Sequence, residues 1–223
     1  MKIAIIVAMD KELQLLLPML NGLAEIDGGR YYTGTMAGHD IIATKVGIGK
    51  VNAALGADTI IREYAPDMVI NTGVAGGTGA TADPARVLDV VLATEVAYHD
   101  VWCGPGTEAG TAAGCPARFA CPLSADVRQA LGAREGLLAS GDIFVDRRDD
   151  LDRILSLYPD ALAVDMESAA IAQTCHMRGV PFVCLRVISD TPGEDGNAAA
   201  YNDFWTAAPE ATFHTLEHLL KLL

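Results

Sequence analysis

Two carboxylates stand where the chain leaves buried strands, and together they could carry out acid–base chemistry. Glu12 follows the apolar stretch 2–9, and Asp190 follows the apolar stretch 180–189. The carboxyl ends of strands border the ligand crevice of an open α/β sheet, so the two acids could face one substrate from opposite sides. Each acid alone also has a structural explanation, since Glu12 could complement a helix dipole and Asp190 could belong to a turn.

A third acidic junction strengthens the case for a site. Asp165 and Glu167 lie in the segment 164–168, where another predicted strand leads into a helix. Three carboxylate-bearing junctions that converge on one sheet edge are hard to attribute to packing alone. The sequence therefore predicts a binding or catalytic site at this edge.

Two glycine-rich segments have the composition of nucleotide-binding loops. Gly47-Ile48-Gly49-Lys50 lacks the third glycine of a dinucleotide fingerprint and the spacing of a phosphate-binding loop, so we expect no nucleotide cofactor. The segment 72–77 directly follows a predicted strand, 68–71. Its glycines would let backbone amides approach a ligand closely, or they would form a tight turn needed only for packing.

The elements that must position these residues alternate along the chain. Strand-length apolar runs alternate with helical patterns, which predicts an α/β fold with a mainly parallel sheet covered on both faces. Asp10 is placed to cap a helix that Pro18 shortens, and the helix 50–64 carries Val51 and Leu55 on its apolar face. The remaining expected elements are strands 3–8, 31–35, 40–46, 89–97, 136–140, 161–165 and 180–188, helices 147–158, 167–177 and 204–223, and a long loop over 103–122.

Composition excludes several classes of partner. The formal net charge is -13 and no basic run occurs, which disfavours nucleic acid and anionic membranes. The apolar stretch 3–9 is too short to span a membrane, and the odd number of cysteines, 5, without a C-x-x-C spacing predicts buried free thiols in the cytoplasm. His214 and His218 lie on one helix face without a third ligand nearby, so we expect no metal site.

Several collinear motifs resemble one known family. Between residue 1 and about residue 205 the chain is similar to the 5'-methylthioadenosine/S-adenosylhomocysteine nucleosidases of the nucleoside phosphorylase superfamily, through Met9 with Glu12, Gly47-Ile48-Gly49-Lys50, Asn71-Thr72-Gly73, Ala75-Gly76-Gly77, Ser140-Gly141-Asp142, Asp165-Met166-Glu167 and Arg186-Val187-Ile188-Ser189-Asp190. The resemblance implies a single three-layer αβα domain over 1–223 around a twisted mixed sheet. It also implies a homodimer in which the loop 99–116 contributes to the partner's site.

The resemblance assigns roles that suit hydrolysis of a ribosyl N-glycosidic bond without a cofactor. Glu12 matches the carboxylate that activates water, Asp190 the acid that protonates adenine at N7, and Glu167 the acceptor for the ribose hydroxyls. The other implied substrate-binding or supporting residues are Met9, Ile48, Val74, Phe144, Val145, Asp165, Met166, Arg186, Ser189 and Tyr201. Met166 and Phe144 have core packing as an alternative explanation.

The chain departs from the family pattern at a few positions. Val74 stands where many members have serine, Asp165 where glutamate is usual, and Tyr201 where phenylalanine is expected. The segment 101–113 is shorter than usual and lacks the aromatic residues common there, which bears on the choice of 5'-substituent.

The sequence leaves three alternatives to this reaction. A purine nucleoside phosphorylase would need cationic donors for phosphate, but the first loop offers Glu12 and the segment before Gly73 offers Asn71 and Thr72. The altered loop would suit another 5'-modified nucleoside, such as futalosine or aminodeoxyfutalosine. An inert binding protein is disfavoured because Glu12, Glu167 and Asp190 are all present.

Overall fold

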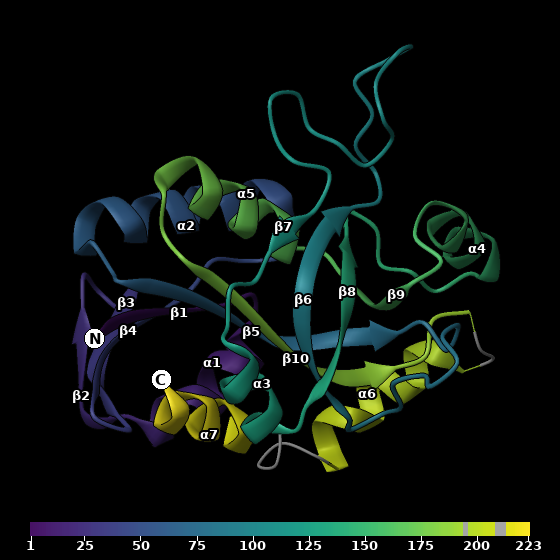
Figure 1. The fold of residues 1–223 in the computed structure, drawn as a ribbon. Coiled ribbons are helices and arrows are strands. Elements are labelled where there is room, and N and C mark those ends of the chain that lie inside the picture. Colours follow the sequence, from purple (N-terminus) through teal and green to yellow (C-terminus); the bar gives the residue numbers. More distant parts are fainter. Residues whose placement is uncertain (194–195, 208–212) are drawn as a thin grey trace.

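The chain forms a mixed sheet with helices on both faces (Figure 1). This computed structural model describes residues 1–193, 196–207 and 213–223. The strands are β1 Lys2–Val7, β2 Asn21–Ile26, β3 Tyr31–Met36, β4 His39–Lys45, β5 Met68–Gly77, β6 Val90–Tyr98, β7 Phe119–Ala120, β8 Arg134–Ser140, β9 Ala161–Asp165 and β10 Phe182–Asp190. The helices are α1 Asp10–Leu16, α2 Lys50–Tyr64, α3 Ala125–Leu131, α4 Arg148–Leu157, α5 Ser168–Arg178, α6 Asn197–Ala207 and α7 His214–Leu222, with a 3-10 turn at Leu17–Met19.

Part of the sheet closes on itself. The main path of the 10-stranded sheet runs β10-β6-β8-β9-β5-β1-β4-β3-β2, and β10 also pairs with β5, so β5, β10, β6, β8 and β9 form a closed ring. The expectation of an open sheet is wrong for this half of the molecule. Gly76 of β5 stands opposite Asp190 of β10 and Val164 of β9, so the ring brings three strand ends to one place.

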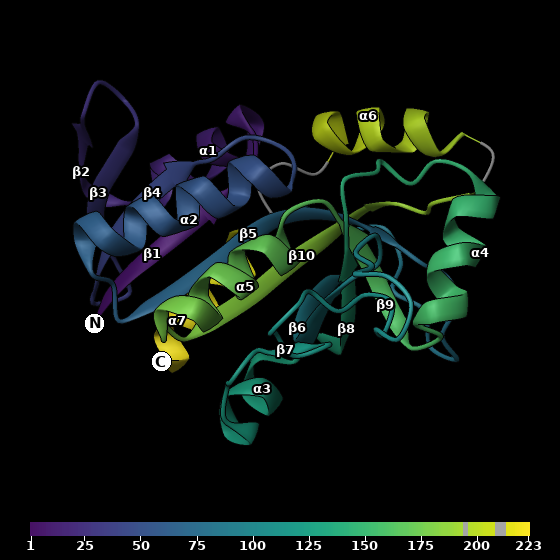
Figure 2. The same cartoon turned by 90° about the horizontal axis from the view of Figure 1, so that it is seen from above.

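The two faces of the sheet have separate apolar cores, which confirms the three-layer arrangement. Ala4 and Ile6 of β1 pack on the side of α2 and α5, while Ile3 and Ile5 pack on the side of α1, α3 and α7. This alternation follows from the two-residue period of a strand. Figure 2 shows α2 and α5 side by side along one face, and α4 packs separately against β8 and β9.

Helix α2 has the predicted bounds but a different buried face. Ala53, Ala57 and Ile60 are buried against the sheet, whereas Val51 is 70% and Leu55 64% exposed. The small alanines let the helix approach α5 and the strands closely, so packing overrides the larger side chains that the sequence pattern favoured.

One further local prediction is wrong, and one of the two alternatives for residues 72–77 is excluded. Asp10 does not cap α1, because Met9 is the N-cap residue and Asp10 forms an exposed ion pair with Lys45 at 2.7 Å. Residues 72–77 form no turn but continue β5, since β10 and β9 supply hydrogen-bonding partners there. The predicted helix 204–223 is represented by the end of α6 and by α7, and residues 208–212 of it lie outside the described residues.

Other predictions stand with small adjustments. Pro18 ends α1 early through the 3-10 turn, and the loop 103–122 contains only the short strand β7. All five cysteines are free; Cys121, Cys175 and Cys184 are buried, but Cys103 is exposed, contrary to expectation. The exposed edge strand β2 and the helix α3 were not predicted.

Candidate active site

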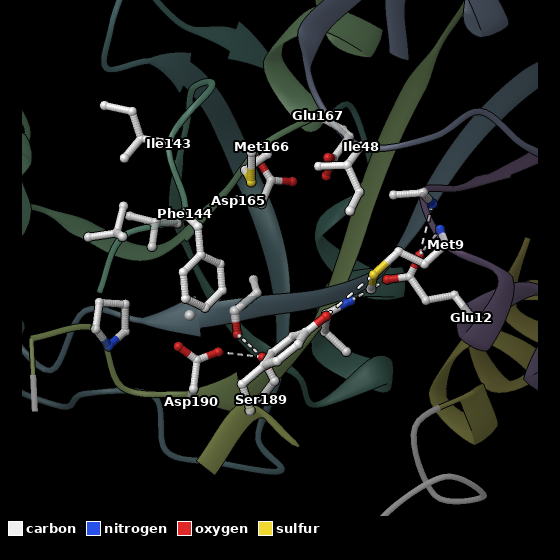
Figure 3. A pocket seen from close by; sticks show the side chains of 18 residues that line it. Met9, Glu12, Ile48, Ile143, Phe144, Asp165, Met166, Glu167, Ser189 and Asp190 are labelled. Carbon is white, nitrogen blue, oxygen red and sulfur yellow. Dashed lines mark hydrogen bonds between the residues drawn. The ribbon is translucent and has the colours of Figure 1, made fainter. Parts of the chain in front are cut away.

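A partly open cavity lies where β1, β5, β9 and β10 end. The cavity has about 610 Å³ of empty space when the open solvent at its mouth is included. It is lined by every site residue that the sequence predicted except Arg186. The lining residues that are not among the predicted site residues are Ala8, Ala75, Gly76, Ile143, Val164 and Pro192. In Figure 3, Glu12, Glu167 and Asp190 lie on different sides of this cavity.

Glu12 is held rigidly in the cavity wall. Its Oε2 accepts hydrogen bonds from the backbone N–H groups of Ala8 at 2.8 Å and Met9 at 2.9 Å, and its Oε1 accepts one from Val74 at 3.0 Å. Burial raises the pKa of Glu12 above its ordinary value, while the charge of Arg186 and the three N–H bonds act against the rise. The carboxylate is thus oriented and its ionised form has donors in place.

Gly73 makes the close approach of Glu12 possible. It lies in β5 with φ of 148°, and a Cβ at this position would collide with the Glu12 carboxylate and the Arg186 guanidinium. No other residue type fits here without displacing the acid or the cation.

Arg186 lies beneath the cavity and neutralises part of its negative charge. Its Nε and Nη2 donate to Oδ2 of Asp165 at 3.0 and 2.6 Å, and both residues are buried. Oδ1 of Asp165 also accepts from the Ser168 hydroxyl at 2.9 Å. Both carboxylate oxygens of Asp165 therefore accept hydrogen bonds from Arg186 or from the start of α5, although Asp165 lines the cavity.

Glu167 completes a group that we call the Arg186 cluster: Glu12, Asp165, Glu167 and Arg186. Glu167 is buried, and its Oε1 accepts a hydrogen bond from the Gly49 N–H at 2.9 Å. Burial first, and then the charge of Asp165, raise the pKa of Glu167 to about 7. One guanidinium faces three carboxylates, so the cluster favours an incoming positive charge or a shared proton.

Asp190 is in a different environment, which we call the Asp190 site: Ser189, Asp190 and Asn197. The Ser189 hydroxyl donates to Oδ1 of Asp190 at 2.5 Å. Burial raises the pKa of Asp190, and the polar side chains of Ser189 and Asn197 only partly counter this. No cation contributes to the shift, so this carboxyl retains a proton more readily than an exposed aspartate does.

An aromatic wall borders the mouth. The rings of Phe144 and Tyr201 meet edge to face at 5.7 Å, and Tyr201 packs in turn on Trp205 at 6.1 Å. The Tyr201 hydroxyl donates to Sδ of Met9 at 3.3 Å. Phe144 is 44% exposed, so a flat ligand could stack on it. The sequence did not single out Trp205 or Asn197, because nothing local distinguishes them from ordinary helix residues.

The chemistry available is that of carboxylates and neutral polar groups. No cluster of three or more His, Cys, Asp or Glu suited to a metal ion occurs among residues 1–193, 196–207 and 213–223. No helix in the described part of the chain is long and apolar enough to cross a membrane. Residues 99–116 are absent from the cavity lining, and Figure 1 shows the segment between β6 and β7 extending away from the sheet.

Comparisons with known proteins agree on one family. The profile of the Phosphorylase superfamily matches residues 2–221. A 5'-methylthioadenosine/S-adenosylhomocysteine nucleosidase of Anoxybacillus flavithermus is 39% identical over 100% of this chain and 97% of its own length. The corresponding protein of Lysinibacillus sphaericus is 37% identical over 100% and 99%.

Solved structures give the same result. The 5'-methylthioadenosine/S-adenosylhomocysteine nucleosidase of S. pneumoniae, determined with the transition-state inhibitor MT-ImmA, superimposes with a TM-score of 0.91 at 35% identity and covers 100% of this chain and 99% of that one. The Neisseria meningitidis enzyme, in complex with methylthio-immucillin-A, superimposes with a TM-score of 0.89 at 37% identity over 100% and 99%.

Proposed function

This chain belongs to the Phosphorylase superfamily, and we propose that it is a nucleosidase that hydrolyses 5'-methylthioadenosine and S-adenosylhomocysteine to adenine and the corresponding 5-thioribose. The observation that carries this proposal is the Glu12 carboxylate in the cavity wall, oriented by three backbone donors. A carboxylate at this place can orient and deprotonate a water molecule.

Hydrolysis replaces the bond between ribose C1' and adenine N9 with a bond from C1' to water oxygen. As the C1'–N9 bond lengthens, positive charge develops on the ribose ring. Glu12 takes a proton from the attacking water, and the ionised carboxylates of the Arg186 cluster stabilise the developing positive charge. Arg186 and Asp165 hold this cluster in place from below.

Glu167 binds the ribose hydroxyls in this mechanism. Its Oε1 is engaged by Gly49, and the other carboxylate oxygen is the acceptor for the diol. Met9, Ile48 and Met166 supply apolar contacts around the sugar from the cavity wall, and Val74 orients Glu12 through its N–H. The diol contact fixes C1' relative to the water on Glu12.

Asp190 provides the proton for the departing base. Adenine stacks on Phe144 under Tyr201, with the backbone near Val145 reading its edge, and Asp190 donates to N7 while Ser189 holds its other oxygen. A proton on N7 makes adenine a neutral leaving group. After the reaction Glu12 carries the proton from water and Asp190 is ionised. When the products leave, Glu12 loses its proton to solvent and Asp190 regains one.

Phosphorolysis is disfavoured by the composition of the cavity wall. Among the described residues that line the cavity, none is lysine or arginine, and Arg186 is turned toward Asp165. A phosphate beside the sugar would need such donors and would instead meet Glu12. Water is the nucleophile that this wall accepts.

The surroundings of the enzyme are also part of the proposal. We expect residues 1–223 to act as one catalytic domain in a cytoplasmic homodimer whose loop 99–116 borders the partner's cavity. The projection of this loop from its own sheet supports that arrangement. The products would enter methionine salvage and the recycling of S-adenosylmethionine by-products.

The direct experiment is adenine release from 5'-methylthioadenosine in phosphate-free buffer, with Asp190→Asn as the control for contaminating activity. We expect fast release that phosphate does not accelerate and that the substitution slows by at least about 10²-fold. Turnover that requires phosphate would contradict hydrolysis. Silence with this substrate and S-adenosylhomocysteine, but turnover of aminodeoxyfutalosine, would redirect the proposal to another 5'-modified nucleoside.

A further inference from the structure

We infer that Asp100, which lines no part of the cavity, is a positioning residue that aims the Gly49 N–H at Glu167 by anchoring Lys50 and Asp142. This inference rests on the proposed function, because Glu167 is there the ligand of the ribose diol. The three anchoring residues come from the ends of different elements, namely β6, β8 and the start of α2.

The loop before α2 needs an anchor. Gly47 and Gly49 both have positive φ, 96° and 94°, so this backbone has access to conformations that other residues rarely adopt. Gly49 is the N-cap of α2, and its N–H makes the 2.9 Å hydrogen bond to Glu167, 118 positions away in sequence. A small rotation of this peptide would remove the only backbone donor that Glu167 has among the described contacts.

Asp100 and Asp142 supply that anchor. Oδ2 of Asp100 accepts from Lys50 Nζ at 2.7 Å and from the Asp142 N–H at 2.8 Å. Oδ1 of Asp142 accepts from the Lys50 N–H at 2.7 Å. The residue after Gly49 is therefore held at its backbone and at its side chain, and one carboxylate oxygen ties both interactions together.

The anchor is partly shielded from solvent. The side chains of Lys50 and Asp100 are 23% and 15% exposed, and Lys50 Nζ also lies over the Tyr98 ring at 5.6 Å. Burial opposes ionisation of Asp100, but the bonds from Lys50 and Asp142 outweigh this and hold its pKa below the ordinary value. A shielded ion pair is more rigid and less screened by salt than an exposed one.

The test compares Asp100→Asn with a matched variant on the same helix. Asp58 of α2 accepts from Nε of Arg178 of α5 at 2.7 Å, so Asp58→Asn breaks an ion pair on the same helix, two turns beyond Lys50. We expect Asp100→Asn to lower kcat/KM by about tenfold, as for a modest misplacement of a substrate-binding group. Asp58→Asn should leave kcat/KM unchanged.

A double-mutant cycle identifies the route of the effect. In a Glu167→Gln background, Asp100→Asn should cause little further loss, because the group that Gly49 positions is already altered. If Asp100→Asn does not fold, two variants of Asp142 test the same anchor. Asp142→Ala should lower kcat/KM, while Asp142→Asn, which keeps an acceptor for the Lys50 N–H, should have nearly the wild-type value. Equal losses in both backgrounds, or equal losses from Asp58→Asn, would overturn the inference.

Hydrogen exchange separates this inference from the proposed function. Asp100→Asn should speed amide exchange over residues 47–50, and Asp58→Asn should not, whether or not the protein releases adenine. Wild-type protein that is inactive on every nucleoside would refute the proposed function alone. Unchanged exchange over 47–50 in Asp100→Asn would refute the anchor, whatever the activity.

Discussion

The two acidic regions of the cavity differ in what they offer to a negative charge. In the Arg186 cluster, Glu12 accepts three backbone N–H bonds above a buried guanidinium. In the Asp190 site, the carboxyl is buried with only the neutral donors of Ser189 and Asn197. Both acids have raised pKa values through burial, but only Glu12 has a cation to oppose the rise.

This difference explains how one cavity can hold a base and an acid of the same chemical type. The environment rather than the residue type decides which carboxyl gives up its proton. Glu12 is oriented to accept a proton from water, and Asp190 is placed to keep one for the leaving group. The comparison is therefore tested by changing each region alone.

The largest expected effect comes from Glu12→Gln. The variant loses the base. Its amide NH₂ group would also face a backbone N–H group whose hydrogen bond the carboxylate oxygen accepts in the wild type. We expect kcat to decrease by up to about 10⁴-fold, which is the upper end of the effect of losing a general base. Steady-state adenine release measures this, with Gln14→Glu, a change on the same helix that leaves Glu12 in place, as the control. A loss of less than tenfold would show that this region does not supply the base.

Asp190→Asn should have the next largest effect. Asparagine has the same shape but carries no transferable proton, so we expect kcat to fall by about 10²- to 10³-fold. Ser189→Ala removes the 2.5 Å hydrogen bond to Asp190 and the 3.3 Å bond to the Ala75 carbonyl, but leaves the acid itself in place, so it should have a smaller effect. A lower kcat for Ser189→Ala than for Asp190→Asn would mean that Asp190 is not the general acid.

Much of this comparison could be predicted from the sequence. Glu12 and Glu167 follow strand ends and Asp190 is the last residue of β10, and strand ends are recognisable from local apolar runs. The closed ring of strands could not be predicted, because β10 pairs with β5 and β6, which lie far from it in the sequence. For the same reason residues 72–77 resemble a turn in sequence and form a strand in the structure.

Other features have no local signal at all. The burial of Arg186 and its bond to Asp165 depend on β9 and β10 meeting through the ring. On α2, Val51 and Leu55 were expected to face the core, but the alanines do so because the helix must pack close to α5.

A smaller effect is expected on stability in the Arg186 cluster. The pKa of Glu167 is about 7 in the folded protein against an ordinary 4.5, so folding favours its protonated form. The stability that this proton contributes is present below pH 4.5 and is lost as the pH rises through 7. Glu167→Gln stays neutral, so its stability relative to wild type should increase by about 1–3 kcal/mol between pH 5 and pH 8.

Denaturant unfolding at the two pH values measures this difference. Glu217→Gln, which removes an exposed ion pair with Lys221, is the control and should show no such dependence. A Glu167→Gln variant whose relative stability does not change with pH would mean that the cluster carries no excess negative charge.

The smallest effect is expected at the mouth, outside both regions. Tyr201→Phe removes a hydroxyl whose partner is the sulfur of Met9 at 3.3 Å. Thioether sulfur is a weak acceptor, so kcat/KM should change by less than about threefold. Tyr201→Ala, which also removes the ring that packs on Phe144, should raise KM more. A large effect of Tyr201→Phe would assign the hydroxyl to substrate binding.

The assignment of the base to Glu12 and of the acid to Asp190 is tested most directly with a substrate whose leaving group needs no proton. A 4-nitrophenyl 5-methylthioribofuranoside would be hydrolysed at the same C1', and its leaving group, 4-nitrophenolate, departs without protonation. Asp190→Asn should then approach the wild-type rate, while Glu12→Gln remains as impaired as with 5'-methylthioadenosine. Equal impairment of Asp190→Asn on both substrates would contradict its role as the acid.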